Sequence, residues 1–229
     1  MDVNVIPAAN RRKKVLIADM DSTIIGCECL DELADMAHLK PQIAAITERA
    51  MNGEIAFEPA LRERVGLLKG LSIAALERTY AERVKLNPGA RALVATMKKH
   101  GARTCLVSGG FTYFTERVAK DAGFEDNQAN VLLDDGNRLT GAVQEPILGR
   151  EAKLNALKKE IEAMKIAREE SLAVGDGAND LAMIEYAGLG VAYRAKPIVA
   201  QAADAAVVHG DLRSLLYLQG YSDAEIVED

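Results

Sequence analysis

The sequence predicts an open α/β fold in which a helical cap is inserted into a parallel sheet. Short apolar runs alternate along the chain with segments of helical periodicity, which is the pattern of parallel strands joined by covering helices. The block from 27 to 87, between the first two of these runs, has several helical patterns and no convincing strand. The 229 residues are enough to bury a sizeable core that carries such an insertion.

Five apolar runs are expected to form the strands of the sheet. Three of them end in polar or glycine-rich segments: Val15–Asp19, Arg103–Val107 before Ser108-Gly109-Gly110, and Ser171–Val174 before Gly175-Asp176-Gly177. The fourth and fifth runs are Gly190–Ala192 and Ala205–Val208. The expected core helices are Ala90–His100, Thr112–Ala122, Arg150–Met164 and Asn179–Ala187.

The inserted block is expected to be a cap made of several helices. The candidates are Leu30–His38, Pro41–Met51, Glu58–Lys69 and Ser72–Val84. We therefore divide the chain into a catalytic core, formed by 1–26 and 88–229, and a cap for substrate specificity, formed by 27–87. In the core, Val131–Gly141 carries Asp135-Gly136-Asn137 between apolar flanks, which predicts a β-hairpin.

Composition and charge exclude several classes of partner. The net charge of −6 and the lack of a broad basic surface argue against nucleic acid and against anionic membranes. No apolar stretch reaches the roughly 18 residues that span a bilayer, and the N-terminus does not resemble a signal peptide. The three cysteines do not suggest a disulfide framework. We therefore expect a cytoplasmic protein.

Four aspartates are expected to meet at the carboxyl ends of the strands, where parallel sheets bind their ligands. Asp19 and Asp21 follow the first strand two residues apart, so on an extended segment both side chains project to the same face. Asp176 and Asp180 follow the third strand. Converging carboxylates repel one another unless a cation neutralises them. Mg²⁺, a hard cation that takes carboxylate and phosphate oxygens, fits such a cluster.

The residues around this cluster point to phosphoryl transfer. A carboxylate can attack a phosphoryl group and form an aspartyl-phosphate, which divides hydrolysis into two easier steps. Ser108, with the amides of Gly109 and Gly110, can bind phosphate oxygens, and Lys153 can supply a counter-charge. Singly, a strand-end aspartate is often a helix N-cap and a lysine is often a solvated side chain. The order in which all of them occur favours the functional interpretation.

Four segments resemble, in this order, the four motifs of the haloacid dehalogenase superfamily, and in particular those of its phosphoserine phosphatases. They are Asp19-Met20-Asp21-Ser22-Thr23, Ser108-Gly109-Gly110-Phe111, Lys153 and Gly175-Asp176-Gly177-Ala178-Asn179-Asp180. The resemblance, which runs from about Lys13 to the C-terminus, implies a Rossmann-type core with Asp19 as nucleophile and Asp21 as general acid and base. It also implies that Mg²⁺ is bound by Asp19, the backbone carbonyl of Asp21, and Asp176, with Asp180 orienting these ligands. The phosphoryl group would be held by Ser108, Gly109, Lys153 and Asn179.

The cap residues bear on the choice of substrate. Phosphoserine carries an ammonium and a carboxylate, so its pocket needs an acid and an arginine. The resemblance implies that Glu28 binds the ammonium, that Arg64 binds the carboxylate, and that Met51 and Phe57 form apolar walls. Arg62 lies two positions from Arg64 and should face elsewhere on a helix. The implied reaction is the hydrolysis of O-phospho-L-serine to L-serine and phosphate, the last step of serine biosynthesis.

Two other functions stay open at this point. The first is a related phosphatase or phosphotransferase that acts on another small phosphate, with homoserine as the acceptor in one relative. The second is a phospho-accepting receiver domain, which also uses an acidic pocket and Mg²⁺. Asp21 would promote turnover, and a helical cap has no place in a receiver of the flavodoxin-like strand order, so the second is disfavoured. Many bacterial phosphoserine phosphatases carry an extra N-terminal domain, whereas only fourteen residues precede Val15, so we expect a short form or a catalytic core.

Overall fold

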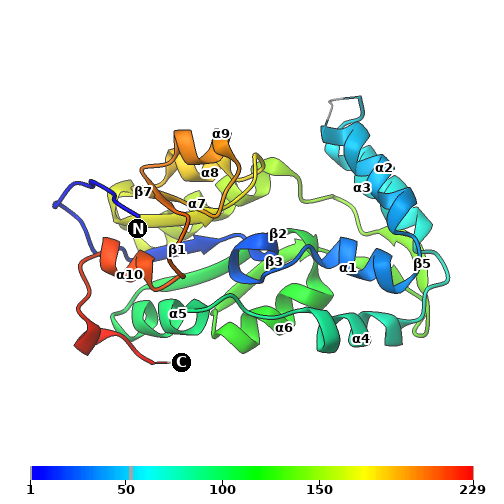
Figure 1. The fold of residues 1–229 in the computed structure, drawn as a ribbon, viewed down its shortest axis with the longest axis horizontal. Helices are drawn as coiled ribbons and strands as arrows, with labels where there is room; N and C mark the ends of the chain where they lie inside the picture. Colours follow the sequence, from blue (N-terminus) through cyan, green and yellow to red (C-terminus); the bar gives the residue numbers. More distant parts are fainter. Residues whose placement is uncertain (1, 52–53, 229) are drawn as a thin grey trace.

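The structure, a computed structural model, describes residues 2–51 and 54–228, without the side chain of Met51. Within these residues a six-stranded parallel sheet has helices on both faces and a helical cap at one end, as Figure 1 shows. The predicted open α/β fold is confirmed. No helix in these two ranges is long and apolar enough to cross a lipid bilayer.

The sheet has the strand order β3-β2-β1-β6-β7-β8, and all neighbouring strands run parallel. Its strands are β1 (Val15–Ala18), β2 (Arg103–Phe111), β3 (Asp126–Asn130), β6 (Ser171–Gly175), β7 (Leu189–Tyr193) and β8 (Ala205–Val207). From β1 the chain adds β2 and β3 on one side and then β6, β7 and β8 on the other. The carboxyl ends of β1 and its two neighbours therefore form the switch point at which such sheets bind ligands.

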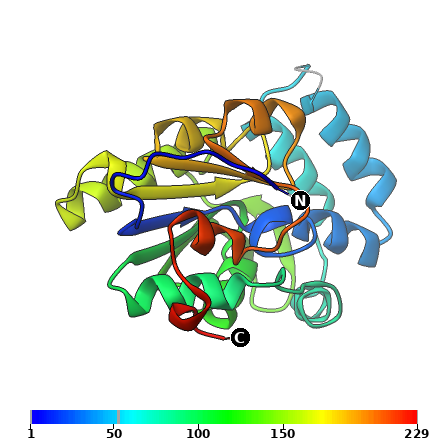
Figure 2. The same ribbon diagram turned by 60° about the vertical axis from the view of Figure 1, so that its left-hand side comes forward.

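Helices cover both faces of the sheet (Figures 1 and 2). One face carries α5 (Ala90–Lys99), α6 (Thr112–Ala122) and α10 (Ser214–Leu218), and the other carries α7 (Arg150–Met164), α8 (Leu181–Tyr186) and α9 (Pro197–Ala202). Leu16 and Ala18 point into the apolar cluster of the first face, whereas Val15 and Ile17 point into that of the second. This burial on both sides explains why β1 is apolar at every position.

The five expected strands are present, but the sequence analysis missed one strand and two helices. β3 has the polar sequence Asp-Asn-Gln-Ala-Asn and forms the edge of the sheet, where only β2 pairs with it. Its residues are half-buried or buried, but four of the five are polar, so no apolar pattern marks the strand. The helices α9 and α10 have six and five residues, which is too short for a helical period to stand out. Two further 3₁₀ turns cover Arg168–Glu170 and Asp223–Glu225.

The cap contains four helices in the part of the chain that the structure describes. They are α1 (Cys29–Met36), α2 (Lys40–Met51), α3 (Phe57–Leu67) and α4 (Ile73–Arg83), within three residues of the expected ends. The two segments that join the cap to the core run antiparallel and pair with each other. Ile25 bridges to Leu86, the Gly26 N–H donates to the Lys85 carbonyl over 3.1 Å, and the Asn87 N–H donates to the Ile24 carbonyl over 2.8 Å.

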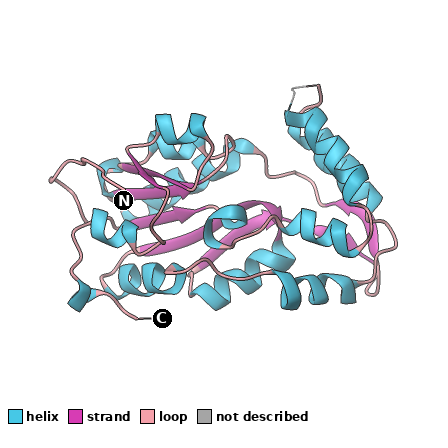
Figure 3. Cartoon of the chain, in the orientation of Figure 1, coloured by secondary structure: helices cyan, strands magenta, loops and turns pink. Residues whose placement is uncertain are grey.

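The predicted hairpin is confirmed as β4 (Leu132–Asp134) and β5 (Leu139–Val143), and it packs on the cap (Figure 3). The Leu139 N–H donates to the Leu71 carbonyl over 2.9 Å, and the Gly70 N–H donates to the Leu139 carbonyl over 2.8 Å. At Gly141, where φ is +80°, an added Cβ would lie 2.8 Å from the Lys69 Cβ. The hairpin thus joins the cap helices by backbone hydrogen bonds, a tertiary contact that its own sequence does not reveal.

Candidate active site

A pocket of about 430 Å³ lies at the carboxyl ends of β1, β2 and β6, under the cap. Nine of the residues singled out from the sequence line it: Asp19, Asp21, Glu28, Phe57, Arg64, Ser108, Gly109, Asp176 and Asn179. Lys153 and Asp180 are buried beside Asp19. Met51 ends α2, and its side chain lies outside the described residues.

The segment after β1 is a tight turn and does not continue the strand. β1 ends at Ala18, and the chain turns sharply at Ser22, which has a φ of +56°. Asp19 and Asp21 themselves have the expected extended backbone conformation, but they lie beyond the strand and do not pair in the sheet as part of it. The turn nevertheless brings both carboxylates into the pocket, because it folds the chain back beneath the start of the cap.

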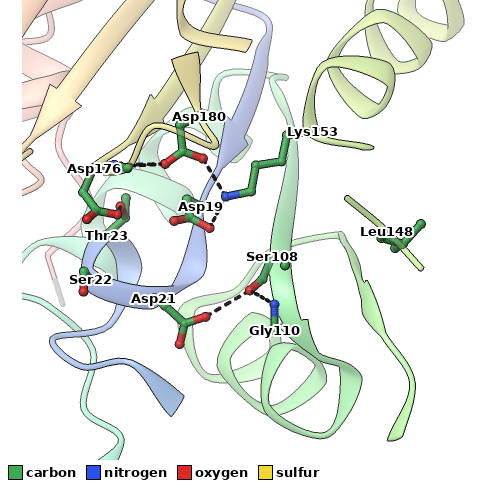
Figure 4. A network of polar contacts seen from close by, with 12 residues as sticks. Asp19, Asp21, Ser22, Thr23, Ser108, Gly110, Leu148, Lys153, Asp176 and Asp180 are labelled. Carbon is green, nitrogen blue, oxygen red and sulfur yellow. Dashed lines mark hydrogen bonds and ion pairs between the residues drawn. The ribbon is translucent and has the colours of Figure 1, made fainter. Parts of the chain in front are cut away.

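Asp19 and Asp180 share the ammonium group of Lys153 (Figure 4). Lys153 Nζ lies 2.5 Å from Asp19 Oδ1 and 2.6 Å from Asp180 Oδ1, and all three side chains are buried. Burial raises the pKa of Asp19 well above its ordinary value, and the charge of Asp180 raises it further. Burial lowers the pKa of Lys153, but the charges of Asp19 and Asp180 outweigh this effect and raise it. The lysine is therefore a fixed cation.

Asp180 orders the loop that follows β6. Its second oxygen, Oδ2, accepts the backbone N–H groups of Asp176 and Gly177 over 3.1 and 3.0 Å. The Asp176 carboxylate is more open and accepts a long hydrogen bond of 3.4 Å from Thr23 Oγ1. Burial raises the pKa of Asp176, and the charge of Asp180 adds to this effect.

The carboxylates of Asp19, Asp176 and Asp180 each place an oxygen within 4.8 Å of the other two. Mg²⁺ takes oxygen ligands, and carboxylate oxygens this close together can serve as its donors. Three carboxylates carry more negative charge than the single ammonium group of Lys153 balances. These residues therefore fit a hard divalent cation. Asp21 places its carboxylate outside this cluster.

Asp21 and Ser108 form the opposite side of the pocket floor. Ser108 Oγ donates to Asp21 Oδ2 over 3.0 Å and accepts the Gly110 N–H over 2.8 Å, and the Cys29 N–H donates to Asp21 Oδ1 over 2.8 Å (Figure 4). Burial raises the pKa of Asp21, and these hydrogen bonds partly oppose the shift. At Gly110 an added Cβ would lie 3.0 Å from Ser108 Oγ and 3.1 Å from Asp21 Oδ2, so a larger residue would press on this hydrogen-bonded pair.

The cap supplies one acid and one base to the pocket. Glu28, at the N-terminus of α1, accepts a hydrogen bond of 2.6 Å from Ser22 Oγ. Burial, and next the charge of Asp21, raise the pKa of Glu28 to about 7. Arg64 donates its Nε–H to the Ala60 carbonyl over 3.2 Å, and in the described part of the chain no carboxylate lies within 4 Å of its guanidinium nitrogens. The pocket end of Arg64 is thus available to a ligand.

Arg62 points away from this pocket, as expected. It lies 2.7 Å from Glu145 and 3.4 Å from Glu58 at the surface. Phe57 is 39% exposed and lies beside Gly109, since a Cβ at this glycine would be 3.4 Å from its ring. Two further charged residues line the pocket, Asp31 from α1 and Lys196 from the start of α9. Neither stood out in the sequence, because single charges near helix ends are common.

Replacing Lys153 is expected to destabilise the fold. In Lys153→Met, with the divalent metal chelated, the buried carboxylates of Asp19 and Asp180 lose their counter-charge, which should lower the free energy of unfolding by about 3 kcal/mol. Urea denaturation measures this change. Lys159→Met, at an exposed position of the same helix, is the control and should change stability by less than about 0.5 kcal/mol. An equal loss in both variants would contradict the proposed charge balance.

The chain matches a family model described as haloacid dehalogenase-like hydrolase over residues 16–185. A phosphoserine phosphatase of Polaromonas sp. (strain JS666) is 46% identical over 210 residues, which are 90% of this chain and 89% of that protein. A solved phosphoserine phosphatase in the form of a phospho-aspartyl intermediate analogue is 38% identical, with a TM-score of 0.81, and covers 90% of this chain and 98% of the other.

A second solved structure, of a substrate-bound phosphoserine phosphatase complex, has a TM-score of 0.82 at 36% identity and the same coverage, 90% and 98%. These likenesses extend over both the core and the cap, because they cover nine-tenths of the chain. The chain therefore belongs to the haloacid dehalogenase-like hydrolases and, within them, to the phosphoserine phosphatase family.

Proposed function

We propose that the protein hydrolyses O-phospho-L-serine to L-serine and phosphate through an aspartyl-phosphate on Asp19. The observation that carries this proposal is that one pocket is lined by two kinds of group. Asp19, whose carboxylate is held by the buried Lys153, and Ser108 suit a phosphoryl group, whereas Glu28 and Arg64 suit the ammonium and the carboxylate of an amino acid. The substrates named for the related proteins have the same two parts.

In the first step, the Asp19 carboxylate attacks the phosphorus atom and the bond from phosphorus to the serine oxygen breaks. Lys153 holds Asp19 by its Oδ1 atom, which fixes the direction of the carboxylate. Asp21 gives its proton to the serine oxygen as that oxygen leaves. The raised pKa of Asp21 keeps this proton available, and the hydrogen bond to Ser108 Oγ fixes the carboxyl group.

In the second step, Asp21 takes a proton from a water molecule, and the resulting oxygen attacks the phosphorus atom of the aspartyl-phosphate. The bond to Asp19 breaks, phosphate leaves, and the Asp19 carboxylate is regenerated. Ser108 Oγ, the Gly109 N–H and Lys153 Nζ are proposed to hold the phosphoryl oxygens during both steps, assisted by Asn179. The same donors thus serve the formation and the breakdown of the intermediate.

Asp19, the backbone carbonyl of Asp21, and Asp176 are proposed to bind Mg²⁺, and Asp180 is proposed to orient them. When bound, Mg²⁺ supplies positive charge that offsets the carboxylates and the phosphoryl oxygens. Both oxygens of Asp180 already accept hydrogen bonds: Oδ1 from Lys153, and Oδ2 from two backbone N–H groups of the loop after β6. This suits an orienting role.

The lid that selects the substrate is proposed to be the cap, residues 27–87, with the hairpin β4–β5 attached to it. The paired segments around Ile25 and Leu86 are its connection to the core. Because phosphoserine is charged and does not cross membranes freely, we also propose that the protein works in the cytoplasm. The proposed reaction would be the last step of serine biosynthesis. No specific observation favours either alternative function, a phosphatase or phosphotransferase for another small phosphate or a phospho-accepting receiver domain.

The proposal is tested by phosphate release from a panel of small phosphomonoesters, with Mg²⁺ and with the metal chelated. Phosphoserine should be the preferred substrate, and chelation should abolish release. Equal rates for phosphoserine and for esters that lack the amino-acid group would refute the substrate. Activity that persists without a divalent metal would refute the role of the carboxylate cluster.

Glu28 predicts a pH dependence for this preference. Because the pKa of Glu28 is about 7 in the free protein, the side chain is charged above that pH and neutral below it. The kcat/KM for phosphoserine should therefore fall as the pH falls through 7, relative to kcat/KM for phosphoglycolate, which has a carboxylate but no ammonium. The ratio of the two profiles removes the titration of the phosphate. Glu28→Gln should flatten this ratio; a ratio that is already flat in the unmodified protein would contradict the assignment.

A further inference from the structure

Asn130, the last residue of the edge strand β3, ties together three segments around the pocket. Its side chain is buried, with 2% of the residue exposed. Nδ2 donates to the Gly109 carbonyl over 2.9 Å and to the Leu148 carbonyl over 3.4 Å, and Oδ1 accepts the Leu148 N–H over 2.7 Å. Both ends of the amide are therefore used, and all three bonds lead to residues outside β3.

The position of Asn130 follows from an irregularity in the sheet. β2 and β3 pair regularly up to Val107, the register then shifts, and pairing resumes between Phe111 and Asn130. Ser108, Gly109 and Gly110 lie in this interruption, where the backbone loses the regular ladder. The carbonyl of the half-buried Gly109 then has no partner in the ladder, and the buried Asn130 amide donates to it.

One peptide plane connects Asn130 to the acid side of the pocket. The Gly109 carbonyl and the Gly110 N–H belong to the same planar peptide group. Asn130 holds the carbonyl end, and the N–H end donates to Ser108 Oγ over 2.8 Å, which in turn donates to Asp21 Oδ2 over 3.0 Å. Figure 4 shows the second part of this chain, from Gly110 through Ser108 to Asp21. Rotation of this peptide group would therefore displace the Ser108 hydroxyl and break its hydrogen bond to Asp21.

The second arm of Asn130 leads to Lys153. Leu148 directly precedes Gly149, the N-cap residue of α7, and Lys153 lies in the first turns of that helix. Gly149 also lies against the cap, since a Cβ there would be 3.8 Å from the Phe57 ring. The single side chain of Asn130 thus holds two segments: the loop that contains Ser108, and the residues before the helix that contains Lys153.

We propose that Asn130 is a positioning residue that sets the phosphoryl-binding groups of the pocket. It holds the peptide between Gly109 and Gly110 and the start of α7 in register, so that Ser108, Gly109 and Lys153 converge on one phosphoryl group. It makes no contact with Glu28 or Arg64 in the structure, so the groups that suit the amino acid do not depend on it. This inference rests on the proposed function for the identity of the group that is bound.

The test is Asn130→Asp, which keeps the acceptor for the Leu148 N–H but places an oxygen against the Gly109 and Leu148 carbonyls. With Mg²⁺ present, the affinity for inorganic phosphate should fall about 10- to 100-fold, the range for residues that orient ligand-binding groups. The affinity for L-serine, a competitive inhibitor under the proposed function, should stay within about 2-fold. The amide resonance of Gly110 in a ¹H–¹⁵N spectrum should shift, because its peptide plane turns.

The matched control is Asn127→Asp on the same strand. Asn127 Oδ1 accepts a hydrogen bond of 2.9 Å from Thr115 Oγ1, which an aspartate can also accept, so phosphate affinity should not change. Asn130→Ser is the second variant if the aspartate variant does not fold. Equal losses of phosphate and serine affinity, or unchanged phosphate affinity, would overturn the proposal. The unmodified protein tests the proposed function separately. If it binds phosphate but neither binds L-serine nor hydrolyses phosphoserine, the proposed function is wrong.

Discussion

Asp19→Asn is expected to abolish phosphate release from phosphoserine, with kcat falling on the order of 10⁴-fold or more, as when a covalent nucleophile is removed. The amide keeps the shape of the side chain but lacks the charged oxygen that attacks phosphorus. Lys153 would still pair with Asp180, so the neighbouring side chains have a reason to stay in place. The rate is measured as phosphate release at saturating phosphoserine with Mg²⁺.

A second measurement separates the nucleophile from a residue that only binds metal. Acid quenching of the reaction with phosphate-labelled substrate should trap label on the unmodified protein and none on Asp19→Asn. Asp35→Asn, on the surface of the cap, is the control and should behave like the unmodified protein. Label that persists on Asp19→Asn would place the phosphoryl group on another residue and would refute the mechanism.

The fold could largely be predicted from the sequence, because buried parallel strands and amphipathic helices leave strong patterns. β1 and β6 are apolar throughout, since helices cover both of their faces. β3 left no such pattern, because an edge strand with polar side chains is held mainly by its backbone pairing with β2. The attachment of the hairpin to the cap was also missed, since it depends on backbone bonds between Leu71 and Leu139.

The candidate site could be predicted where its chemistry depends on residue type. Aspartates, a lysine and a Ser-Gly-Gly segment are recognisable in a sequence, and the structure brings them together at one edge of the sheet. The sharp turn at Ser22 could not be predicted, because it depends on how the chain passes from the core into the cap. Asn130 was missed for a similar reason. Its role arises from a shift in register between β2 and β3, and no residue type in the sequence predicts that shift.

Arg64→Ala is expected to lower kcat/KM for phosphoserine about 100-fold, which corresponds to about 2.7 kcal/mol of lost binding to the transition state. A guanidinium group can bind a carboxylate through two parallel hydrogen bonds. Burial lowers the pKa of Arg64, and the charges of Asp31 and Glu28 partly oppose this, so the guanidinium group is partly desolvated. A substrate carboxylate placed there would be held strongly.

Phosphoethanolamine and Arg62→Ala make this prediction specific to the carboxylate. Phosphoethanolamine keeps the ammonium and the phosphate but has no carboxylate, so its kcat/KM should change by less than about 3-fold in Arg64→Ala if Arg64 acts only on that group. Arg62→Ala removes the same charge from the same helix, yet Arg62 pairs with Glu145 at the surface, so neither substrate should be affected. If kcat/KM falls equally for both substrates in Arg64→Ala, the residue supports the cap and does not select phosphoserine. The proposed nucleophile would survive that result, because the hydrogen bond that holds the Asp19 carboxylate comes from Lys153 and does not involve Arg64.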